Sequence, residues 1–410
     1  MSQLRVQAFI SSSIKYQIVK ASKQDRAKAF RFIVALGIVS LFADMTYEGA
    51  RGIIGPFFQN LGATAAQVGF IAGFGEMIAA SLRLFSGRLA DRTHAYWTIA
   101  IIGYFLNLVA VPLLAFAGNW QAAALLVVLE RTGKGLRGPA VDVLLSESTE
   151  VVGHGWGFGL HSAMDQTGAV LGPLVVTIAL ARTHHFDAGF FWLAVPAVAA
   201  MMALLFARAA RPNKEKPAPP VKVENLPRVF WFYVVAAGLL ALGFIDFPLL
   251  AYHFQKSGIT KSETIPLLYA AAMGLGGLTA LLFGKLYDMF GLPTIVFSIF
   301  ISLLALPFGF LGGHVGAYLS VGCWATGLGA QDAMLRPAIA QVVSMNKRGS
   351  AFGALNGIYG VLWFLGSATM GLLYDYSMPA LVVFGISAQV AAAIMFFFLR
   401  KPLAAARRGN

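Results

Sequence analysis

The sequence predicts an all-α integral membrane protein with twelve transmembrane helices in two six-helix pseudo-repeats around a central cavity. Three observations lead to this fold class. Of the 410 residues, 58% are apolar and 12% are charged, whereas ordinary soluble domains carry about 25% charged residues. Twelve runs are long and apolar enough to cross a bilayer, and the two halves of the chain resemble each other. This composition cannot cover a soluble surface and excludes a soluble globular enzyme.

The twelve runs are punctuated by glycine, proline and charged residues, and each supplies the roughly 20 apolar residues that a membrane helix needs. They cover residues 30–58, 67–90, 96–117, 120–146, 156–181, 188–208, 229–254, 264–288, 293–312, 315–343, 349–374 and 379–399. We therefore expect a cytosolic N-terminal arm (1–29), a first six-helix bundle (30–208), a Lys-, Glu- and Pro-rich cytosolic linker (209–228), a second bundle (229–400) and a cytosolic tail (401–410).

Basic residues set the expected orientation, because Lys and Arg are retained on the cytoplasmic side of a membrane. With both termini in the cytoplasm, 22 of the 31 basic residues lie in cytoplasmic segments and 3 lie in the opposite loops. This bias accounts for most of the net charge of +13 without a nucleic-acid partner. We expect a multi-pass protein of the cell inner (plasma) membrane with both termini cytoplasmic.

The internal repeat is visible at a nearly constant shift along the chain. The segment FFQNLGAT at 57–64 resembles HFQKSGIT at 253–260, and Gly87, Leu89 and Asp91 match Gly284, Leu286 and Asp288. Parallel six-helix repeats of this kind are typical of secondary transporters whose binding site lies between the halves at the middle of the membrane.

Several motifs resemble those of the major facilitator superfamily. The run GRLADR at 87–92 resembles the core of that superfamily's loop between helices 2 and 3. Arg131 and Gly135 resemble its helix-4 basic motif, and Gly168-x-x-x-Gly172-Pro173 resembles the glycine–proline motif of its proton-coupled exporters. The resemblance covers about residues 30–400 and extends to a largely bacterial subgroup of transporters without an assigned substrate.

Ionisable side chains inside the predicted spans are the candidate site, because each costs about 2.5–3.5 kcal/mol at the bilayer centre unless it has a partner or a watery cavity. There are thirteen of them, six basic and seven acidic. Eleven form the expected proton and substrate cavity: Asp44, Glu48, Arg51, Glu76, Arg83, Arg131, Lys134, Asp165, Asp246, Asp332 and Arg336. The other two are Glu130 and Arg137.

Spacing on the first helix is the most informative part of this set. Asp44, Glu48 and Arg51 fall at i, i+4 and i+7, so they share one face, which we expect to point at the cavity. Two carboxylates one turn apart repel each other, and only one is neutralised by Arg51. The other is a candidate proton carrier. Asp246 corresponds approximately to Asp44 in the repeat and is a second candidate.

The remaining charges can pair within their own helices. Glu130 with Lys134 and Asp332 with Arg336 are i, i+4 pairs, which we interpret as structural. Glu76 and Arg83 lie two turns apart on the second helix. For Asp165, one turn before Gly168, a cavity role and a helix-packing role both stay open.

The resemblance implies a cytoplasmic gate formed by Gly87, Asp91, Arg92 and Asp142. It implies that Asp91 meets the amino end of the eleventh helix near residues 349–350, where free N–H groups favour a carboxylate. Arg92 or Arg88 would pair with Asp142. Gly168, Gly172 and Pro173 are expected to mediate helix packing.

We expect a secondary active transporter that works by alternating access, with proton-coupled export of a small amphipathic molecule as the leading hypothesis. One alternative is proton-coupled uptake of an organic anion gripped by an arginine, and another is a non-transporting sensor or lipid-handling protein. No hydrolase, metal or nucleotide motif is present in the sequence, so we expect no enzyme, no metal and no cofactor. The expected partners are a small-molecule substrate, protons and the lipid bilayer, and the expected state is a monomer.

Overall fold

The computed structural model describes residues 23–210, 226–340, 343 and 348–409. The elements in these ranges are all helices, in agreement with the expected all-α fold class. Most of the expected N-terminal arm and the centre of the expected linker lie outside the described residues.

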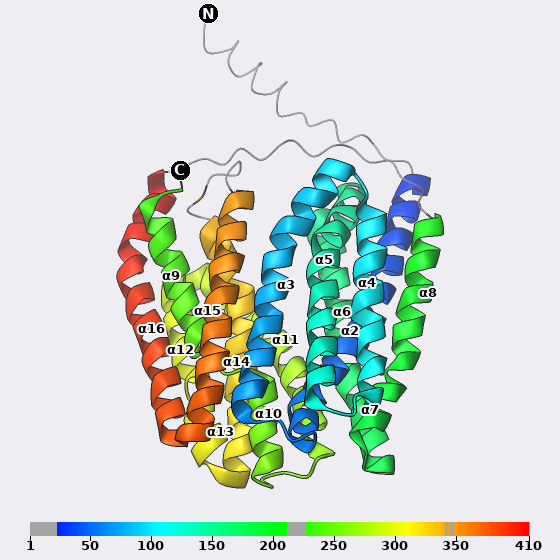
Figure 1. Cartoon of the computed structure of the whole chain (residues 1–410). Coiled ribbons are helices and arrows are strands. Elements are labelled where there is room, and N and C mark those ends of the chain that lie inside the picture. Colours follow the sequence, from blue (N-terminus) through cyan, green and yellow to red (C-terminus); the bar gives the residue numbers. More distant parts are fainter. Residues whose placement is uncertain (1–22, 211–225, 341–342, 344–347, 410) are drawn as a thin grey trace, which may run out of the picture.

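The first half of the chain forms one group of helices and the second half forms another (Figure 1). The first group contains α2 (Lys23–Asn60), α3 (Ala65–Thr93), α4 (Tyr96–Leu113), the 3-10 turn η1 (Leu114–Phe116), α5 (Trp120–Val152), α6 (His154–Thr183), α7 (Phe186–Trp192) and α8 (Ala194–Ala210). The second contains α9 (Arg228–Gly243), α10 (Phe247–Lys256), α11 (Thr264–Phe290), α12 (Leu292–Ser302), α13 (Ala305–Leu311), α14 (Gly313–Ala340), α15 (Arg348–Tyr376) and α16 (Met378–Gly409).

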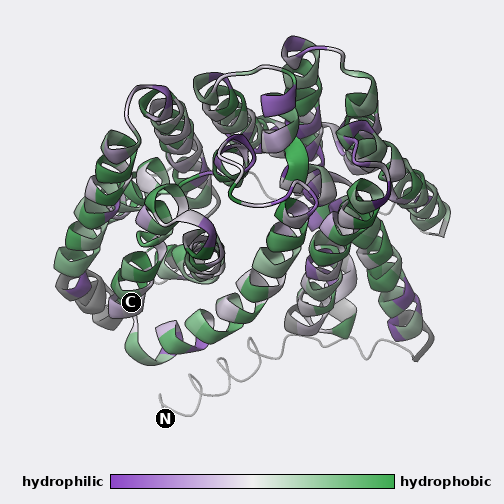
Figure 2. Ribbon diagram, turned by 90° about the horizontal axis from the view of Figure 1, so that it is seen from below, coloured by the Kyte–Doolittle hydropathy of each residue, from purple (hydrophilic) through white to green (hydrophobic). Residues whose placement is uncertain are grey.

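Ten helical stretches in the described residues are long and apolar enough to cross a membrane. The other two expected spans correspond to α5 and α14, which have 33 and 28 residues but carry more polar side chains. At 1.5 Å per residue both are longer than the roughly 30 Å hydrocarbon core. Both run alongside the apolar helices of their own groups (Figure 1), so twelve spans remain our prediction. Figure 2 shows hydrophobic residues along most of the helices.

Matched positions of the repeat adopt the same local structure. Gly62 after α2 and Gly258 after α10 both have positive φ, +79° and +61°. In each turn the next residue donates its N–H to a carbonyl five residues back, at 2.9 Å for Ala63 to Phe58 and 3.1 Å for Ile259 to Phe254. A left-handed glycine that ends a helix in this way explains why both copies keep glycine there.

The predicted span 229–254 is broken in the middle. Helix α9 ends at Gly243 and α10 begins at Phe247, so residues 244–246 are not helical. Pro248 causes the break, because its ring would clash with the carbonyl four residues earlier, that of Phe244, and it has no N–H to donate. The freed carbonyls find other donors: Gln389 Nε2 bonds the Gly243 oxygen at 2.9 Å, and Trp324 Nε1 bonds the Ile245 oxygen at 2.8 Å.

Other boundaries differ from the expected ones for simpler reasons. The first helix begins at Lys23, seven residues before the apolar run, because a helix can extend into a polar segment that stands outside the hydrocarbon. The spans predicted at 188–208 and 293–312 each consist of two helices, α7 with α8 and α12 with α13. Each pair still crosses as one candidate span.

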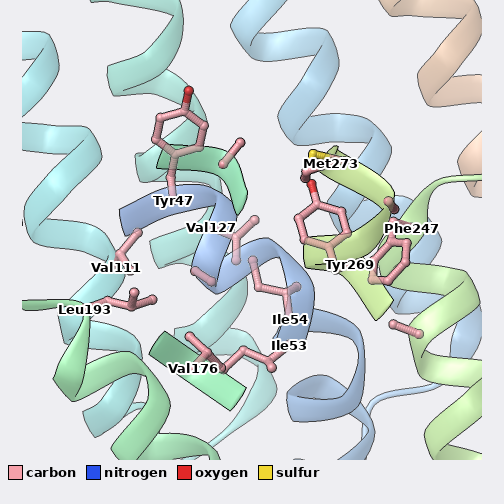
Figure 3. Close-up of a cluster of buried hydrophobic side chains, with 14 of the residues drawn as sticks. Tyr47, Ile53, Ile54, Val111, Val127, Val176, Leu193, Phe247, Tyr269 and Met273 are labelled. Atoms are coloured by element: carbon pink, nitrogen blue, oxygen red, sulfur yellow. The ribbon is translucent and has the colours of Figure 1, made fainter. Parts of the chain in front are cut away.

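Three pairs of helices make most of the contacts between the two groups: α3 with α15, α6 with α11, and α2 with α10. We call the end where α2 begins and α16 ends the basic end, because Arg26, Arg31, Arg88 and Arg208 lie there, and the other the distal end. Ile53 and Ile54 of α2 lie in one buried cluster with Tyr269 of α11 and Phe247 of α10 (Figure 3). Tyr269 of this cluster also lines the site described next.

Candidate functional site

A cavity of about 630 Å³ lies between the two groups of helices. Its walls come from α2, α3, α5 and α6 on one side and α11, α14 and α15 on the other. Towards the basic end its lining includes exposed residues, Ser162 and Asp332, whereas Glu48 at its inner end is buried. The volume falls within the range of about 300–1,000 Å³ typical of small-molecule sites.

The distal end is closed by contacts between the two groups. Gly55 of α2 packs directly on the backbone of Pro248 in α10, leaving no room for a side chain. The Tyr252 hydroxyl donates a hydrogen bond to the Ala63 carbonyl at 3.0 Å. The cavity is therefore open towards the basic end and shut at the distal end.

Arg51 is the centre of an ion-pair network at the inner end of the cavity. Its Nη2 atom lies 3.0 Å from Glu76 Oε1 on α3 and 3.3 Å from Asp246 Oδ1 in the broken segment. Asp246 also accepts a hydrogen bond from Trp363 Nε1 at 3.1 Å. Arg131 adds a 3.5 Å contact to Glu76. The helix break places the buried Asp246 carboxylate where an arginine of the other bundle can reach it.

Glu48 makes a second bridge between the bundles. Its Oε1 atom lies 3.4 Å from Lys134 Nζ on α5, and its Oε2 atom accepts a 2.5 Å hydrogen bond from the Tyr269 hydroxyl on α11. The Lys134 ammonium also lies 4.1 Å from the centre of the Tyr47 ring, where cation–π attraction adds to the ion pair. Both charges of the Glu48–Lys134 pair therefore have partners.

Asp44 belongs to a separate group of charges. Its carboxyl lies beside that of Asp165, close enough for the two to share a hydrogen bond when one of them holds a proton, and the positive charges of Arg137 and Lys134 act on it. Arg137 lies 4.4 Å from the ring centre of Tyr104. Asp165 also lies 3.9 Å from His161. Its Oδ1 atom has no hydrogen-bond donor among the described residues.

The structure pairs several predicted residues differently from the sequence expectation. Lys134 contacts Glu48 rather than Glu130, and Glu130 lies 3.2 Å from Arg131 and accepts a 2.7 Å hydrogen bond from Asn107. The expected structural pair of Glu130 and Lys134 is therefore wrong, because a neighbouring helix offers each side chain a closer partner.

The other predicted cavity residues are distributed as follows. Glu76 pairs with Arg51 and Arg131 instead of Arg83 two turns away, and both Glu76 and Arg83 line the cavity. Asp332 lines its wide end. The side chain of Arg336 lies outside the described residues, so its pairing with Asp332 stays a prediction.

The predicted gate residues lie at the basic end. Asp91 accepts a hydrogen bond from the Tyr96 hydroxyl of its own bundle at 3.1 Å. Arg92 and Asp142 are exposed, and Gly87 faces Pro139 of α5. The side chains of residues 349–350, the expected partners of Asp91, lie outside the described residues.

The glycines of the predicted packing motif lie against α2. A side chain on Gly168 would collide with the Leu41 carbonyl, and one on Gly172 would collide with the backbone of Met45. Pro173 lies within α6, and its carbonyl accepts a 2.9 Å hydrogen bond from Thr177. The close approach brings α6, and with it Asp165, next to Asp44 on α2.

Sequence reasoning missed the aromatic partners of these charges. Tyr269 and Trp363 bind Glu48 and Asp246 directly, and Tyr359 stands beside Trp363 with ring centres 5.7 Å apart. An aromatic residue in an apolar run carries no charge signal. The available clue was spacing, because Tyr359 and Trp363 are one turn apart on the same helix.

Comparison with known proteins agrees with this architecture. A family model described as Major Facilitator Superfamily matches residues 36–367. The chain belongs to the Major Facilitator Superfamily. The family resemblance inferred from the sequence motifs is thereby confirmed, and the protein is a multi-pass membrane transporter of that superfamily.

Individual relatives extend the comparison. The chain is 39% identical over 384 residues to "Uncharacterized protein Rv2265" of Mycobacterium tuberculosis, across 91% of this chain and 94% of that protein. It is 30% identical over 142 residues to "Multidrug resistance protein MdtH" of Proteus mirabilis, across 34% of this chain and 35% of that protein. The crystal structure of the nucleoside transporter NupG shares the fold, with a TM-score of 0.68 at 14% identity, covering 92% of this chain and 98% of that one.

Proposed function

We propose that this transporter exports a small amphipathic cation in exchange for protons, by alternating access across the cell inner membrane. In this proposal the protein is a monomer, both termini and the basic end are cytoplasmic, and the structure is the inward-facing state. Export is supported by the glycine–proline motif and by the partial similarity to a protein named for multidrug resistance. The eleven residues named from the sequence are proposed to form the transport site, some by contacting substrate or proton and others by holding its walls together.

The two walls of the cavity differ in charge, and this difference is the main support for the proposal. Among the described lining residues, the first bundle supplies Asp44, Glu48, Arg51, Glu76, Arg83, Lys134 and Asp165, and the second bundle supplies one charge, Asp332. Apart from the amide of Asn356, the rest of the second wall is aromatic, aliphatic or glycine, with Tyr269, Met273, Leu328, Tyr359 and Trp363 as the large side chains. A molecule with one charged and one aromatic face fits between such walls.

The charges favour a cation over an anion. Arg51 is held by two carboxylates, Arg131 by Glu76 and Glu130, and Lys134 by Glu48. An anionic substrate that bound Arg51, Arg131 or Lys134 would have to break these buried pairs and leave carboxylates without partners, which is strongly unfavourable. A cation would find the Asp165 carboxylate on one wall and, on the other, aromatic faces for cation–π attraction.

The carboxyl pair of Asp44 and Asp165 is the proposed proton site. Two adjacent carboxyls, of which Asp44 is buried and Asp165 is partly exposed, repel each other as anions, and one shared proton removes the repulsion. A cation beside Asp165 would stabilise the doubly ionised pair and release that proton. Substrate and proton would then compete for one site, which is the linkage that antiport requires. Glu48 and Asp246, the other predicted carriers, are instead proposed to hold the bundles together through their ion pairs.

The proposed cytoplasmic gate is the set Gly87, Asp91, Arg92 and Asp142. Because Asp91 bonds to Tyr96 within its own bundle while the cavity is open, it is available to meet the amino end of α15 when the basic end closes. That contact would belong to the outward-facing state.

A binding experiment with matched probes tests the proposal. Purified protein in weakly buffered detergent is titrated with benzyltrimethylammonium or phenylacetate, which share an aromatic ring and differ in charge, while a pH dye follows protons. We expect the cation to bind and release protons, and Asp165→Asn to abolish the release. Asp187→Asn, an exposed carboxylate in α7 at the distal end, is the control. Preferential binding of phenylacetate, or cation binding without proton release, would refute the proposal and favour the organic-anion alternative.

A further inference from the structure

A carboxylate at the distal end holds the two bundles together through a helix terminus. Asp375, in the last turn of α15, accepts a hydrogen bond from the backbone N–H of Ala66 at 3.0 Å. Ala66 is the second residue of α3, so this N–H is one of the donors that a helix leaves without an intrahelical partner. The positive end of the helix dipole also favours a carboxylate there.

Close packing brings the two helix ends within reach. A side chain on Gly371 of α15 would collide with the carbonyl of Ala65, and one on Gly69 of α3 would collide with the carbonyl of Ser367. Small residues on both sides let the two backbones touch. The Asp375 carboxylate, one residue before the end of α15, can therefore reach across the interface between α15 and α3.

The same two helices carry the reciprocal arrangement at the basic end. Helices α3 and α15 run antiparallel, so the carboxyl end of each lies beside the amino end of the other (Figure 1). Asp91 stands at the carboxyl end of α3 as Asp375 stands at the carboxyl end of α15. In this structure the Asp375 contact is made, whereas Asp91 bonds to Tyr96 of its own bundle.

The interface between α6 and α11 has a related polar contact at the distal end. Helices α6 and α11 correspond to α15 and α3 under the internal repeat. His184, the C-cap of α6, lies 2.9 Å from Glu263, the N-cap of α11. The Glu263 carboxylate thus lies at the amino end of a helix, where a negative charge is favoured. Both helix pairs, α3 with α15 and α6 with α11, are therefore linked by a polar contact at the closed end of the cavity.

We propose that Asp375 is a positioning residue for alternating access, which holds the distal end closed as the counterpart of Asp91 at the basic end. Opening the distal end requires α15 to leave α3 there, which breaks the Asp375 contact. Closing the basic end brings Asp91 to α15. The two carboxylates therefore bias the same equilibrium in opposite directions. The inference rests on the alternating access of the proposed function but not on its substrate or coupling ion.

The test is the conformational equilibrium without substrate or pH gradient. Spin labels at Gly118→Cys and Val315→Cys, in a protein that carries Cys323→Ala, report the distance across the distal end from the two bundles. Asp375→Asn should increase the distal-open fraction about two- to fivefold, the value of a charge at a helix end. Asp91→Asn should decrease it, and the double variant should lie between the single variants.

The controls separate a gate from a merely structural role. Asp187→Asn, at the distal end but within one bundle, should leave the distances unchanged. A general loss of stability would broaden the distances in both Asp375→Asn and Asp91→Asn, whereas the inference requires opposite shifts. Equal shifts, or no shift in Asp375→Asn with the fold intact by circular dichroism, would overturn it. Because no transport is measured, failure of proton coupling would leave this result untouched.

Discussion

Replacing Arg51 with methionine tests the ion-pair network at the inner end of the cavity. Arg51 bridges Glu76 and Asp246, and its side chain is 15% exposed while that of Asp246 is 1% exposed. Methionine keeps much of the volume of the side chain but removes the charge. Asp246 would then be a buried carboxylate whose remaining described donor is Trp363.

The size of the effect follows from this burial. Removing one partner of a buried ion pair costs about 3–5 kcal/mol, because the remaining charge is left without compensation. Glu76 contributes less to the loss, since Arg131 stays 3.5 Å away. We therefore expect Arg51→Met to lower the free energy of unfolding by about 3–5 kcal/mol.

Equilibrium unfolding in mixed detergent micelles measures this difference, with the double variant Arg51→Met/Asp246→Asn as the matched control. The asparagine keeps an acceptor for Trp363 but carries no charge, so the double variant should recover most of the loss. A loss below about 1 kcal/mol, the scale of an exposed pair, would refute the reasoning. So would a double variant whose loss equals the sum of the two single losses.

Two further outcomes are expected from residues outside the network. Gly172→Leu should lower the free energy of unfolding by about 1–3 kcal/mol or prevent folding, because the new side chain would meet the Met45 backbone. Gly159→Leu on the same helix, where nothing lies within 4 Å of the added carbon, is the control and should be tolerated. Equal shifts of the melting temperature in the two variants would contradict the packing account. The pKa of the Glu263 carboxyl is lowered, first by a hydrogen bond with its own backbone N–H and then by His184. The contact with His184 is the part that joins the two bundles. Through it the Glu263 charge stabilises the closed distal end above the ordinary glutamate pKa of about 4.3, and this stabilisation is lost as the pH falls through the lowered value. The distal spin-label distance should lengthen on acidification in that window, and Glu263→Gln should remove the response; an unchanged response in the variant would contradict the assignment.

Much of the fold was readable from the sequence because hydrophobic length acts on whole segments. The repeat was also readable, since Gly62 and Gly258 keep the residue that a left-handed turn requires. The break at residues 244–246 was missed, although Pro248 is a local signal for it. The apolar run is long enough for one span, and a search for spans counts apolar residues. It does not detect where the helix backbone is interrupted.

The candidate site was only partly predictable. Spacing placed Asp44, Glu48 and Arg51 on one face of α2, and all three line the cavity. Spacing within one helix could not identify their partners, because Lys134 reaches Glu48 across to another helix and Asp246 reaches Arg51 from the other bundle. Asp375 was not singled out at all, since a carboxylate at the end of a span looks like an ordinary polar boundary until the neighbouring helix terminus is placed beside it.

The most direct test of the central claim is flux of a permanently charged aromatic cation under an imposed pH gradient. Proteoliposomes with the membrane potential clamped to zero are loaded with acid or alkaline buffer, and uptake of ethidium is followed against protein-free vesicles. Proton antiport predicts accumulation when the lumen is acid, none when it is alkaline, and loss of accumulation in Asp165→Asn. Accumulation with an alkaline lumen, or equal uptake under both gradients, would contradict the account.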